Sequence, residues 1–247
     1  MTAVRSALVT GGSRGIGAEV ANKLAAEGYH LTIAARTAET LEATAERLRA
    51  EHGVEVQPVV ARMNDLDEVR ALAAAHGDRF GGLNVLVLSA GTGTAGPVAD
   101  MPAKTYERML DVNFRAPITL VQAAIPLLRK SAAEDAARGA KIIALASITG
   151  VVGEAGLAAY GATKAALVSL CETVSLEESA GGVSATAISP GYVDTDMTAW
   201  KREELDRSAM LTTNDVAEMV LAITRLSRNA VVPNIVLSRA GDQLWRA

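Results

Sequence analysis

The chain has 247 residues, a length typical of one large α/β domain. Hydrophobic residues make up 49% of it and aromatic residues only 3%, so the core has to be built mainly from Ala, Val, Ile and Leu. The net charge is −4 with no basic block, which argues against a nucleic-acid partner, and the single cysteine excludes an intramolecular disulfide. We find no apolar run of about 18 residues, so we predict no membrane partner. The single thiol fits a reducing cytosol, so we predict a cytoplasmic protein.

Short apolar runs alternate with longer helical patterns along the whole chain. The runs are rich in Val, Ile, Leu and Ala and do not alternate with polar residues, as expected of strands buried on both faces of a parallel sheet. The predicted strands are residues 7–10, 31–35, 54–60, 85–89, 141–146, 183–188 and 231–237.

Helical spacing fills the stretches between these strands. The predicted helices include residues 37–52, 65–76, 106–129, 158–179 and 214–225. We expect the third of these to break or bend near Pro117 and Pro126, because proline cannot donate the helical hydrogen bond. The alternation predicts an α/β fold in a single domain, 1–247. Its core is a Rossmann-type doubly wound parallel sheet of about seven strands, with helices on both faces.

Residues 10–17, Thr-Gly-Gly-Ser-Arg-Gly-Ile-Gly, join the first strand to the first helix. Glycines at such a turn allow a tight bend, a close approach to a pyrophosphate and close packing of helix on strand. The helix N-terminus also offers free N–H groups to phosphates. The alternative is a glycine-rich turn without a ligand, but its place in the first βα unit favours a dinucleotide. The predicted cofactor contacts are Thr10, Gly11, Ser13, Arg14, Gly15, Ile16 and Gly17.

The second strand ends in Ala35-Arg36-Thr37, without the carboxylate that holds the ribose 2′-hydroxyl of NAD. A guanidinium binds a 2′-phosphate through paired hydrogen bonds, whereas a carboxylate repels it. Arg36 and Arg14, helped by Thr37 or Ser13, therefore predict NADP(H) as the cofactor. The alternative is that both arginines are solvated surface residues.

Tyr160 and Lys164 are four residues apart in a predicted helix, so their side chains share one face. A nearby cation stabilises a phenolate and lowers the tyrosine pKa from about 10, which suits proton transfer to or from a carbonyl oxygen. Alone, this pair also fits a half-buried tyrosine beside a surface lysine. Ser147 follows the fifth strand at the sheet edge where ligands bind in doubly wound folds, and a glycine-rich segment leads from it back toward Tyr160.

These motifs occur in the order found in short-chain dehydrogenases/reductases, and the sequence resembles that family over nearly its whole length. The matching segments are residues 10–17, Asp111-Val112-Asn113, Ser147, Tyr160-x-x-x-Lys164, and residues 190–195, Pro-Gly-Tyr-Val-Asp-Thr. The opening segment is similar to that of 3-oxoacyl-carrier-protein reductases, although this segment binds the cofactor and not the acyl group.

The resemblance implies a role for each matching residue. Tyr160 is expected to be the general acid/base, and Ser147 to orient the carbonyl. Lys164 is expected to bind the nicotinamide ribose and lower the Tyr160 pKa, and Asn113 to hold a water that completes a proton relay. The further cofactor contacts it implies are Tyr160 and Lys164 themselves, Ser89, Ala90 and Gly91, and Pro190, Gly191, Val193 and Thr195.

Three segments depart from the family pattern. Ser89-Ala90-Gly91 replaces the usual Asn-Ala-Gly. Residues 61–64 lack the aspartate that often meets the adenine amino group, so Arg62 either stacks on adenine or points to solvent. Residues 238–245 replace most of a glycine-rich turn. None of these changes affects Ser147, Tyr160 or Lys164.

Residues 191–211 have no regular pattern, and the resemblance implies that they form a lid over the substrate. Met197, Trp200, Leu205, Met210 and Leu211 are its candidate apolar lining, and Val151, Val152, Glu154, Thr92 and Thr94 are further candidate pocket residues. The mix favours a moderately apolar ketone or alcohol.

Family members pair helices equivalent to residues 106–129 and 158–179, so we expect a homodimer or homotetramer. We predict an NADP-dependent oxidoreductase without a metal, acting on a small carbonyl compound or alcohol. The alternative is a catalytically silent NADP(H)-binding protein that senses redox state or acts through a partner.

Overall fold

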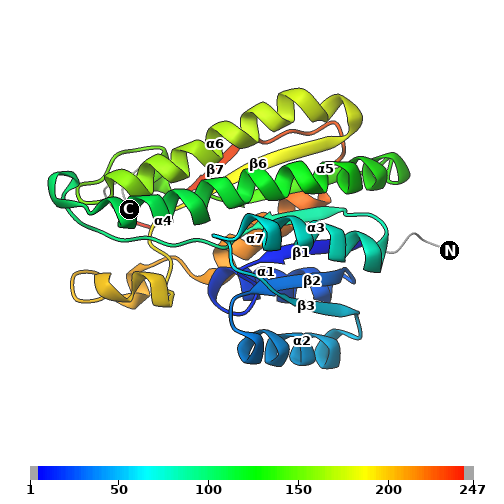
Figure 1. Ribbon diagram of the computed structural model, residues 1–247, viewed down its shortest axis with the longest axis horizontal. Coiled ribbons are helices and arrows are strands. Elements are labelled where there is room, and N and C mark those ends of the chain that lie inside the picture. The colour runs from blue at the N-terminus through cyan, green and yellow to red at the C-terminus, as the bar shows by residue number, and fades with distance from the viewer. Residues whose placement is uncertain (1–4, 242–247) are drawn as a thin grey trace.

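The computed structural model describes residues 5–241, and these form one seven-stranded parallel sheet (Figure 1). The strands are β1 (Ser6–Thr10), β2 (His30–Ala35), β3 (Val56–Val60), β4 (Val85–Leu88), β5 (Ala140–Leu145), β6 (Val183–Pro190) and β7 (Asn234–Leu237). Their order, β3-β2-β1-β4-β5-β6-β7, changes direction between β1 and β4. Every predicted strand is present, with shifts of only a few residues at the ends, and the predicted doubly wound fold is confirmed.

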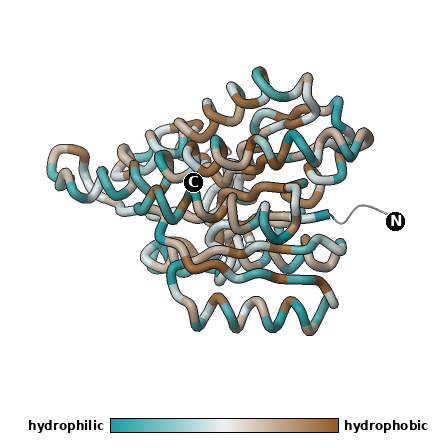
Figure 2. Tube along the Cα trace, turned by 45° about the vertical axis from the view of Figure 1, so that its right-hand side comes forward, coloured by the Kyte–Doolittle hydropathy of each residue, from teal (hydrophilic) through white to brown (hydrophobic). Residues whose placement is uncertain are grey.

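Helices cover both faces of this sheet. One core lies under α1 (Gly15–Ala26), α2 (Ala38–His52) and α7 (Thr213–Arg225), and the other under α3 (Leu66–Phe80), α5 (Ala116–Glu134) and α6 (Ala158–Glu178). Within β1, Ala7 and Val9 pack into the first core and Leu8 into the second, as the two-residue repeat of a strand requires. Both faces are therefore apolar, and the hydrophobic positions run along the middle of the molecule (Figure 2).

The predicted helix over residues 106–129 is longer than expected and contains one irregular turn. It consists of α4 (Ala103–Leu110), a π-helical turn over Asp111–Arg115, and α5. The N–H of Ala116 donates to the carbonyl of Asp111, five residues earlier. The irregularity directly precedes Pro117, as expected, whereas α5 continues without interruption through Pro126.

Residues 191–211 leave the carboxyl end of β6 and contain two short 3-10 turns, Asp196–Lys201 and Arg207–Ala209 (Figure 1). The Asp194 carboxylate accepts hydrogen bonds from Arg202 at 2.8 Å and from Arg207 at 2.7 Å. A bridge between Val193 and Leu211 closes the base of the segment. The segment is thus folded and partly helical, and its action as a lid stays a prediction.

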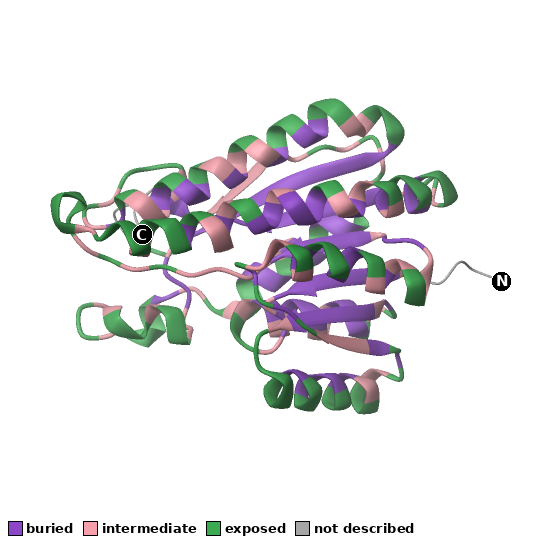
Figure 3. Ribbon diagram, in the orientation of Figure 1, coloured by how far each residue is buried: buried purple, intermediate pink, exposed green. Residues whose placement is uncertain are grey.

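Burial follows the layers, with buried strands and helices exposed on their outer sides (Figure 3). Some apolar side chains are nevertheless exposed, among them Tyr106 and Leu110 on α4 and Leu176 on α6, the last at 86%. They fit the predicted homo-oligomer, which stays a prediction. Among the described helices, none combines the length and apolar character needed to cross a membrane.

Candidate functional site

The glycine turn after β1 has the backbone that the sequence predicted. Gly11 and Gly15 have φ angles of +70° and +57°, in the region that side chains disfavour. A Cβ on Gly17 would lie only 2.3 Å from the carbonyl oxygen of Gly11. Side chains are therefore excluded at Gly11 and Gly15 by the turn and at Gly17 by the close approach of α1 to the turn.

The turn is fixed to the end of β4, at the point where the strand order changes direction. The hydroxyl of Thr10 accepts hydrogen bonds from the N–H groups of Ser89 at 3.0 Å and Ala90 at 3.1 Å. It donates to the carbonyl of Val87 at 3.3 Å. Ligands bind at such switch points in open α/β sheets. Thr10 therefore places the segment Ser89–Gly91 beside Gly11, although Ser89 replaces the usual asparagine.

Arg14 precedes α1, and no side chain caps this helix end. Its guanidinium lies 3.1 Å from the Asp196 carboxylate at the start of the 191–211 segment, and its side chain is 70% exposed. The N–H groups at the start of α1 thus stay available to an anion. Arg14 uses one guanidinium nitrogen for Asp196 in an exposed ion pair, and its contact with a phosphate stays a prediction. Ile16 lies in the first turn of α1, half-buried, and Ser13 offers its carbonyl to Thr44 at 3.3 Å.

Arg36 and Thr37 are exposed where β2 ends. Within residues 5–241, the Arg36 guanidinium has no hydrogen-bond or ion-pair partner. Arg62 behaves differently, since it donates to Glu68 at 2.5 Å and Asp65 at 3.1 Å and is held on the surface by them. Three features together fit a phosphorylated dinucleotide. They are the glycine turn after β1, the uncapped start of α1 and the unpaired guanidinium of Arg36.

Ser147 and Tyr160 meet at the carboxyl edge of the sheet. Ser147 follows β5, and its hydroxyl accepts hydrogen bonds from the Thr149 N–H at 3.2 Å and the Thr149 hydroxyl at 2.9 Å. Tyr160 lies in the first turn of α6. A Cβ on Gly161 would lie 2.6 Å from the Thr149 carbonyl oxygen, so glycine there lets α6 approach the loop after Ser147.

A cavity of about 80 Å³ opens between these two hydroxyls and the 191–211 segment. Its wall includes Ser147, Thr149, Leu157, Tyr160, Gly191, Tyr192, Met197 and Trp200. Ligand sites usually measure about 300–1,000 Å³, so this cavity is small for a substrate, as expected if the 191–211 segment acts as a lid. Met197 and Trp200 confirm their predicted position in the wall. The predicted lining residues Leu205, Met210 and Leu211 are not part of this wall. Met210 is buried in the interior, and Leu211 forms the bridge to Val193.

Burial dominates the pKa values of the two titratable groups on α6. It raises the pKa of Tyr160 to about 12, while a hydrogen bond with Ser147 acts in the opposite direction. It lowers the pKa of Lys164 to about 8. The Lys164 ammonium lies 5.6 Å from the centre of the Tyr160 ring and donates to the Leu145 carbonyl at 2.7 Å. Burial thus sets the direction of the Tyr160 pKa here, and the expected lowering of this pKa by Lys164 stays a prediction.

Asn113 lies in the π-helical turn and is fully buried. Its amide oxygen accepts from the Thr92 N–H at 2.8 Å, and its amide nitrogen donates to the Thr92 carbonyl at 2.8 Å and the Thr163 hydroxyl at 3.0 Å. Pro117 has no N–H to donate to the Asn113 carbonyl four residues earlier. A Cβ on Gly91 would lie 3.5 Å from both the Asn113 amide oxygen and the Lys164 nitrogen, so these two groups flank the same glycine.

The residues after β6 connect the cavity to the glycine turn. Pro190 ends β6, Gly191 lines the cavity, and Val193 forms the bridge to Leu211. Thr195 approaches the glycine turn, since its methyl group would lie 3.7 Å from a Cβ on Gly15. The structure therefore brings the predicted catalytic and cofactor residues to one edge of the sheet.

Tyr192 and Glu154 form a contact that sequence reasoning missed. The Tyr192 hydroxyl donates to Glu154 at 2.7 Å, and its ring meets Trp200 edge to face at 6.1 Å between centres. Burial and the Glu154 carboxylate raise the Tyr192 pKa. Glu154 was considered as a pocket residue, but no spacing in the sequence pairs it with Tyr192, which is 38 positions away.

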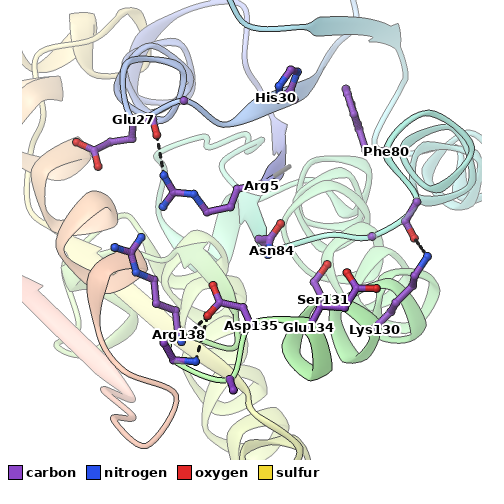
Figure 4. Close-up of a pocket in the computed structure, with 15 residues that line it drawn as sticks. Arg5, Glu27, His30, Phe80, Asn84, Lys130, Ser131, Glu134, Asp135 and Arg138 are labelled. Atoms are coloured by element: carbon purple, nitrogen blue, oxygen red, sulfur yellow. Dashed lines mark hydrogen bonds between the residues drawn. The ribbon is translucent and has the colours of Figure 1, made fainter. Parts of the chain in front are cut away.

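A much larger cavity, about 810 Å³, lies at the opposite edge of the sheet (Figure 4). Arg5, His30 and Asn84 in its wall all precede or begin a strand, and so mark the amino ends. Several of its polar groups have partners, since Arg5 donates to the Glu27 carbonyl and Lys130 to the Gly81 carbonyl. Size alone therefore does not identify the site. No cluster of metal-ligating side chains occurs among residues 5–241.

Comparison with known proteins gives one consistent result. A family model described as short chain dehydrogenase matches residues 5–206. The 3-oxoacyl-[acyl-carrier-protein] reductase of Staphylococcus aureus is 33% identical, over 98% of this chain and 93% of that protein.

Solved structures agree in fold. An alcohol dehydrogenase from Thermococcus sibiricus, complexed with 5-hydroxy-NADP, superposes with a TM-score of 0.86 at 26% identity and covers 95% of this chain and 96% of its own. A short chain dehydrogenase from Burkholderia cenocepacia in complex with NADP gives a TM-score of 0.84 at 29% identity, covering 97% and 98% of the two chains.

Proposed function

The chain belongs to the short-chain dehydrogenase family, and from this premise we propose that it transfers a hydride between NADP(H) and a ketone or secondary alcohol. One observation carries the proposal. The hydroxyls of Ser147 and Tyr160 line a single cavity at the carboxyl edge of the sheet, with the Lys164 ammonium buried one helical turn beyond Tyr160. A protein that only bound a dinucleotide would have no need of this arrangement.

The glycine turn, the start of α1, Arg36 and Thr37 are the residues proposed to hold the dinucleotide phosphates. Ser89, Ala90 and Gly91 are proposed to lie along it, with Pro190, Gly191, Val193 and Thr195 on the nicotinamide side. The free Arg36 guanidinium favours a 2′-phosphate over a bare hydroxyl. NADP-bound relatives of the same fold support this choice. When bound, this cofactor supplies or accepts the hydride.

Ser147 and Tyr160 handle the substrate oxygen. Both hydroxyls donate hydrogen bonds to a carbonyl oxygen and so polarise it. Burial raises the Tyr160 pKa to about 12, so the phenol is protonated at neutral pH and holds the proton that the reduction requires. In reduction, the phenol O–H bond breaks as the new O–H bond of the product alcohol forms, and the reverse step occurs in oxidation.

Lys164 and Asn113 support the phenolate that remains. The Lys164 ammonium carries three N–H groups, and one bonds the Leu145 carbonyl. The other two can bond a ribose hydroxyl or a water, and their charge stabilises the phenolate. The Asn113 carbonyl, opposite Pro117, is proposed to hold that water and so to return a proton to Tyr160.

A screen of ketones with NADPH, followed at the nicotinamide absorbance, tests the proposal. The wild type is expected to reduce at least one ketone. Tyr160→Phe should lower kcat by about 10³-fold or more, because the proton donor is lost, while NADPH affinity stays within about threefold. Near-normal turnover in this variant would contradict the assignment. NADPH binding by the wild type without turnover of any ketone would favour the silent binding protein.

A further inference from the structure

Glu154 carries a buried carboxylate oxygen without a partner. The residue lies in the loop between Ser147 and α6, and its Oε1 accepts the Tyr192 hydroxyl at 2.7 Å. Its Oε2 is buried and has no hydrogen-bond partner among residues 5–241. An unpaired charged oxygen away from water is costly, so such groups in native proteins require an explanation.

The surroundings of Glu154 place this carboxylate beside the substrate cavity. Tyr192 lines the cavity, and so does Leu157, whose N–H donates to the Glu154 carbonyl at 3.1 Å. The Lys201 ammonium lies 5.6 Å from the centre of the Tyr192 ring, but it pairs with Glu204 at 2.5 Å. Glu154 therefore forms no ion pair within the part of the chain that the structure describes.

Hydrogen-bond chemistry then distinguishes two walls of the cavity. Ser147 and Tyr160 supply hydroxyl donors to a substrate carbonyl. Glu154 itself is not part of the cavity wall, but Tyr192 is, and the Tyr192 hydroxyl gives its only proton to Glu154. The Tyr192 oxygen on that wall and the Glu154 carboxylate beside it therefore act as acceptors. A substrate that forms hydrogen bonds on both sides therefore needs a carbonyl oxygen, which accepts from Ser147 and Tyr160, and a hydrogen-bond donor elsewhere in the molecule.

From this we infer that Glu154, supported by Tyr192, selects carbonyl substrates that carry a hydrogen-bond donor, a hydroxyl or an ammonium group. Outward movement of the 191–211 segment admits the substrate, and its donor then pairs with Oε2. A site built around an acceptor disfavours the analogue that lacks the donor, because the buried oxygen is again left unpaired. The inference rests on the proposed reduction of carbonyl compounds.

The test compares cyclohexanones that carry a methyl, a hydroxyl or an ammonium group at C3 or C4. Two quantities are measured for each ketone. The first is kcat/KM with NADPH, and the second is the Kd of the ketone for the enzyme–NADP⁺ complex, determined by calorimetry. The wild type is expected to prefer at least one hydroxyl or ammonium ketone over its methyl counterpart by about tenfold or more in both. Glu154→Gln, which keeps the shape and removes the charge, should reduce the ratio to about threefold or less. The exposed Glu46→Gln on α2 serves as the matched control and should keep the wild-type ratio.

Equal ratios in the wild type and Glu154→Gln would overturn the inference. Turnover without any donor preference would overturn it while leaving the proposed function standing. A donor preference in binding that Glu154→Gln removes, with no turnover, would support the inference and reject the proposed function. Should Glu154→Gln fail to fold, Glu154→Ala takes its place, since it also removes the carboxylate and should reduce the ratio to about threefold or less. A wild-type ratio in Glu154→Ala would overturn the inference.

Discussion

The two ends of β5 each have a buried lysine, and the two lysines differ in how far their hydrogen bonds are used. At the amino end, Lys141 donates to the Ser184 hydroxyl at 3.1 Å and the Ser227 carbonyl at 3.2 Å. At the carboxyl end, Lys164 donates only to the Leu145 carbonyl at 2.7 Å among the described residues. Burial lowers the pKa of both. Lys164 has two N–H groups left unused, against one on Lys141, and only Lys164 lies beside the Tyr160 phenol.

The same contrast holds for other buried polar groups. At the amino edge, the ring of His76 lies within 2.8 to 3.1 Å of the Ser6 and Thr32 hydroxyls and the Gly82 carbonyl. At the carboxyl edge, Glu154 keeps an unpaired oxygen. Burial of an ionisable group therefore does not mark the site in this fold. What distinguishes Lys164 and Glu154 at the carboxyl edge is that the described residues leave more of their hydrogen-bonding capacity unused.

The first test of this comparison replaces each of the two buried lysines by methionine and measures the effect on activity. Lys164→Met should lower kcat/KM with NADPH by about 10²-fold or more, because the phenolate loses its cation. Lys141→Met should change kcat/KM by about threefold at most, since its partners are internal. Steady-state kinetics at matched folded fractions, checked by thermal unfolding, give the measurement. A Lys141→Met enzyme as impaired as Lys164→Met would break the distinction between the two edges.

A second prediction concerns stability at the amino edge. Burial lowers the pKa of His76 to about 4, below its ordinary 6.5. Between these values the unfolded chain takes up a proton that the folded chain does not, so stability is lost as the pH falls from 6.5 toward 4. The full loss is about 3 kcal/mol. The free energy of unfolding, measured in urea, should fall between pH 7 and pH 5 by more than half of this amount. In His76→Gln the free energy of unfolding should depend less on pH. An unchanged slope in that variant would show that other groups cause it.

The smallest expected effect concerns the free guanidinium at the end of β2. Arg36→Asp should raise the KM for NADPH by about tenfold or more and shift preference toward NADH, because a carboxylate repels the 2′-phosphate. Arg62→Gln is the matched control, since Arg62 is already paired with Glu68, and it should change KM by about threefold at most. Equal efficiency of NADH and NADPH in the wild type would contradict the cofactor prediction.

Much of the fold follows from local sequence. Runs such as residues 183–188 lack polar alternation because both faces are buried, and this property alone identifies strands of a parallel sheet. Gly11 and Gly15 could be predicted because their turn requires positive φ angles. The start of the helix before Pro117 is less well predicted, because the apolar spacing does not indicate that this helix begins at Ala103.

The site was predictable as far as its residues recur in ordered motifs, and less so where distant residues meet. Ser147, Tyr160 and Lys164 share one short segment, so their spacing carries the prediction. The pairing of Glu154 with Tyr192 and of Arg14 with Asp196 depends on how the 191–211 segment folds back. The direction of the Tyr160 pKa also could not be read from residue types, because it depends on the degree of burial.

The π-helical turn at Asp111–Arg115 has a consequence for how this helix tolerates change. Removing one residue before Asn113 would let α4 run into α5 with ordinary four-residue hydrogen bonds. It would also rotate everything upstream against everything downstream by about 100°, the angle of one helical residue. The amide of Asn113 and its contacts with Thr92 and Thr163 could not then share one orientation with the residues on both sides. A regular α-helix at this position would therefore misplace the Asn113 amide. Single-residue deletions here should lower stability and activity far more than deletions in the neighbouring turns.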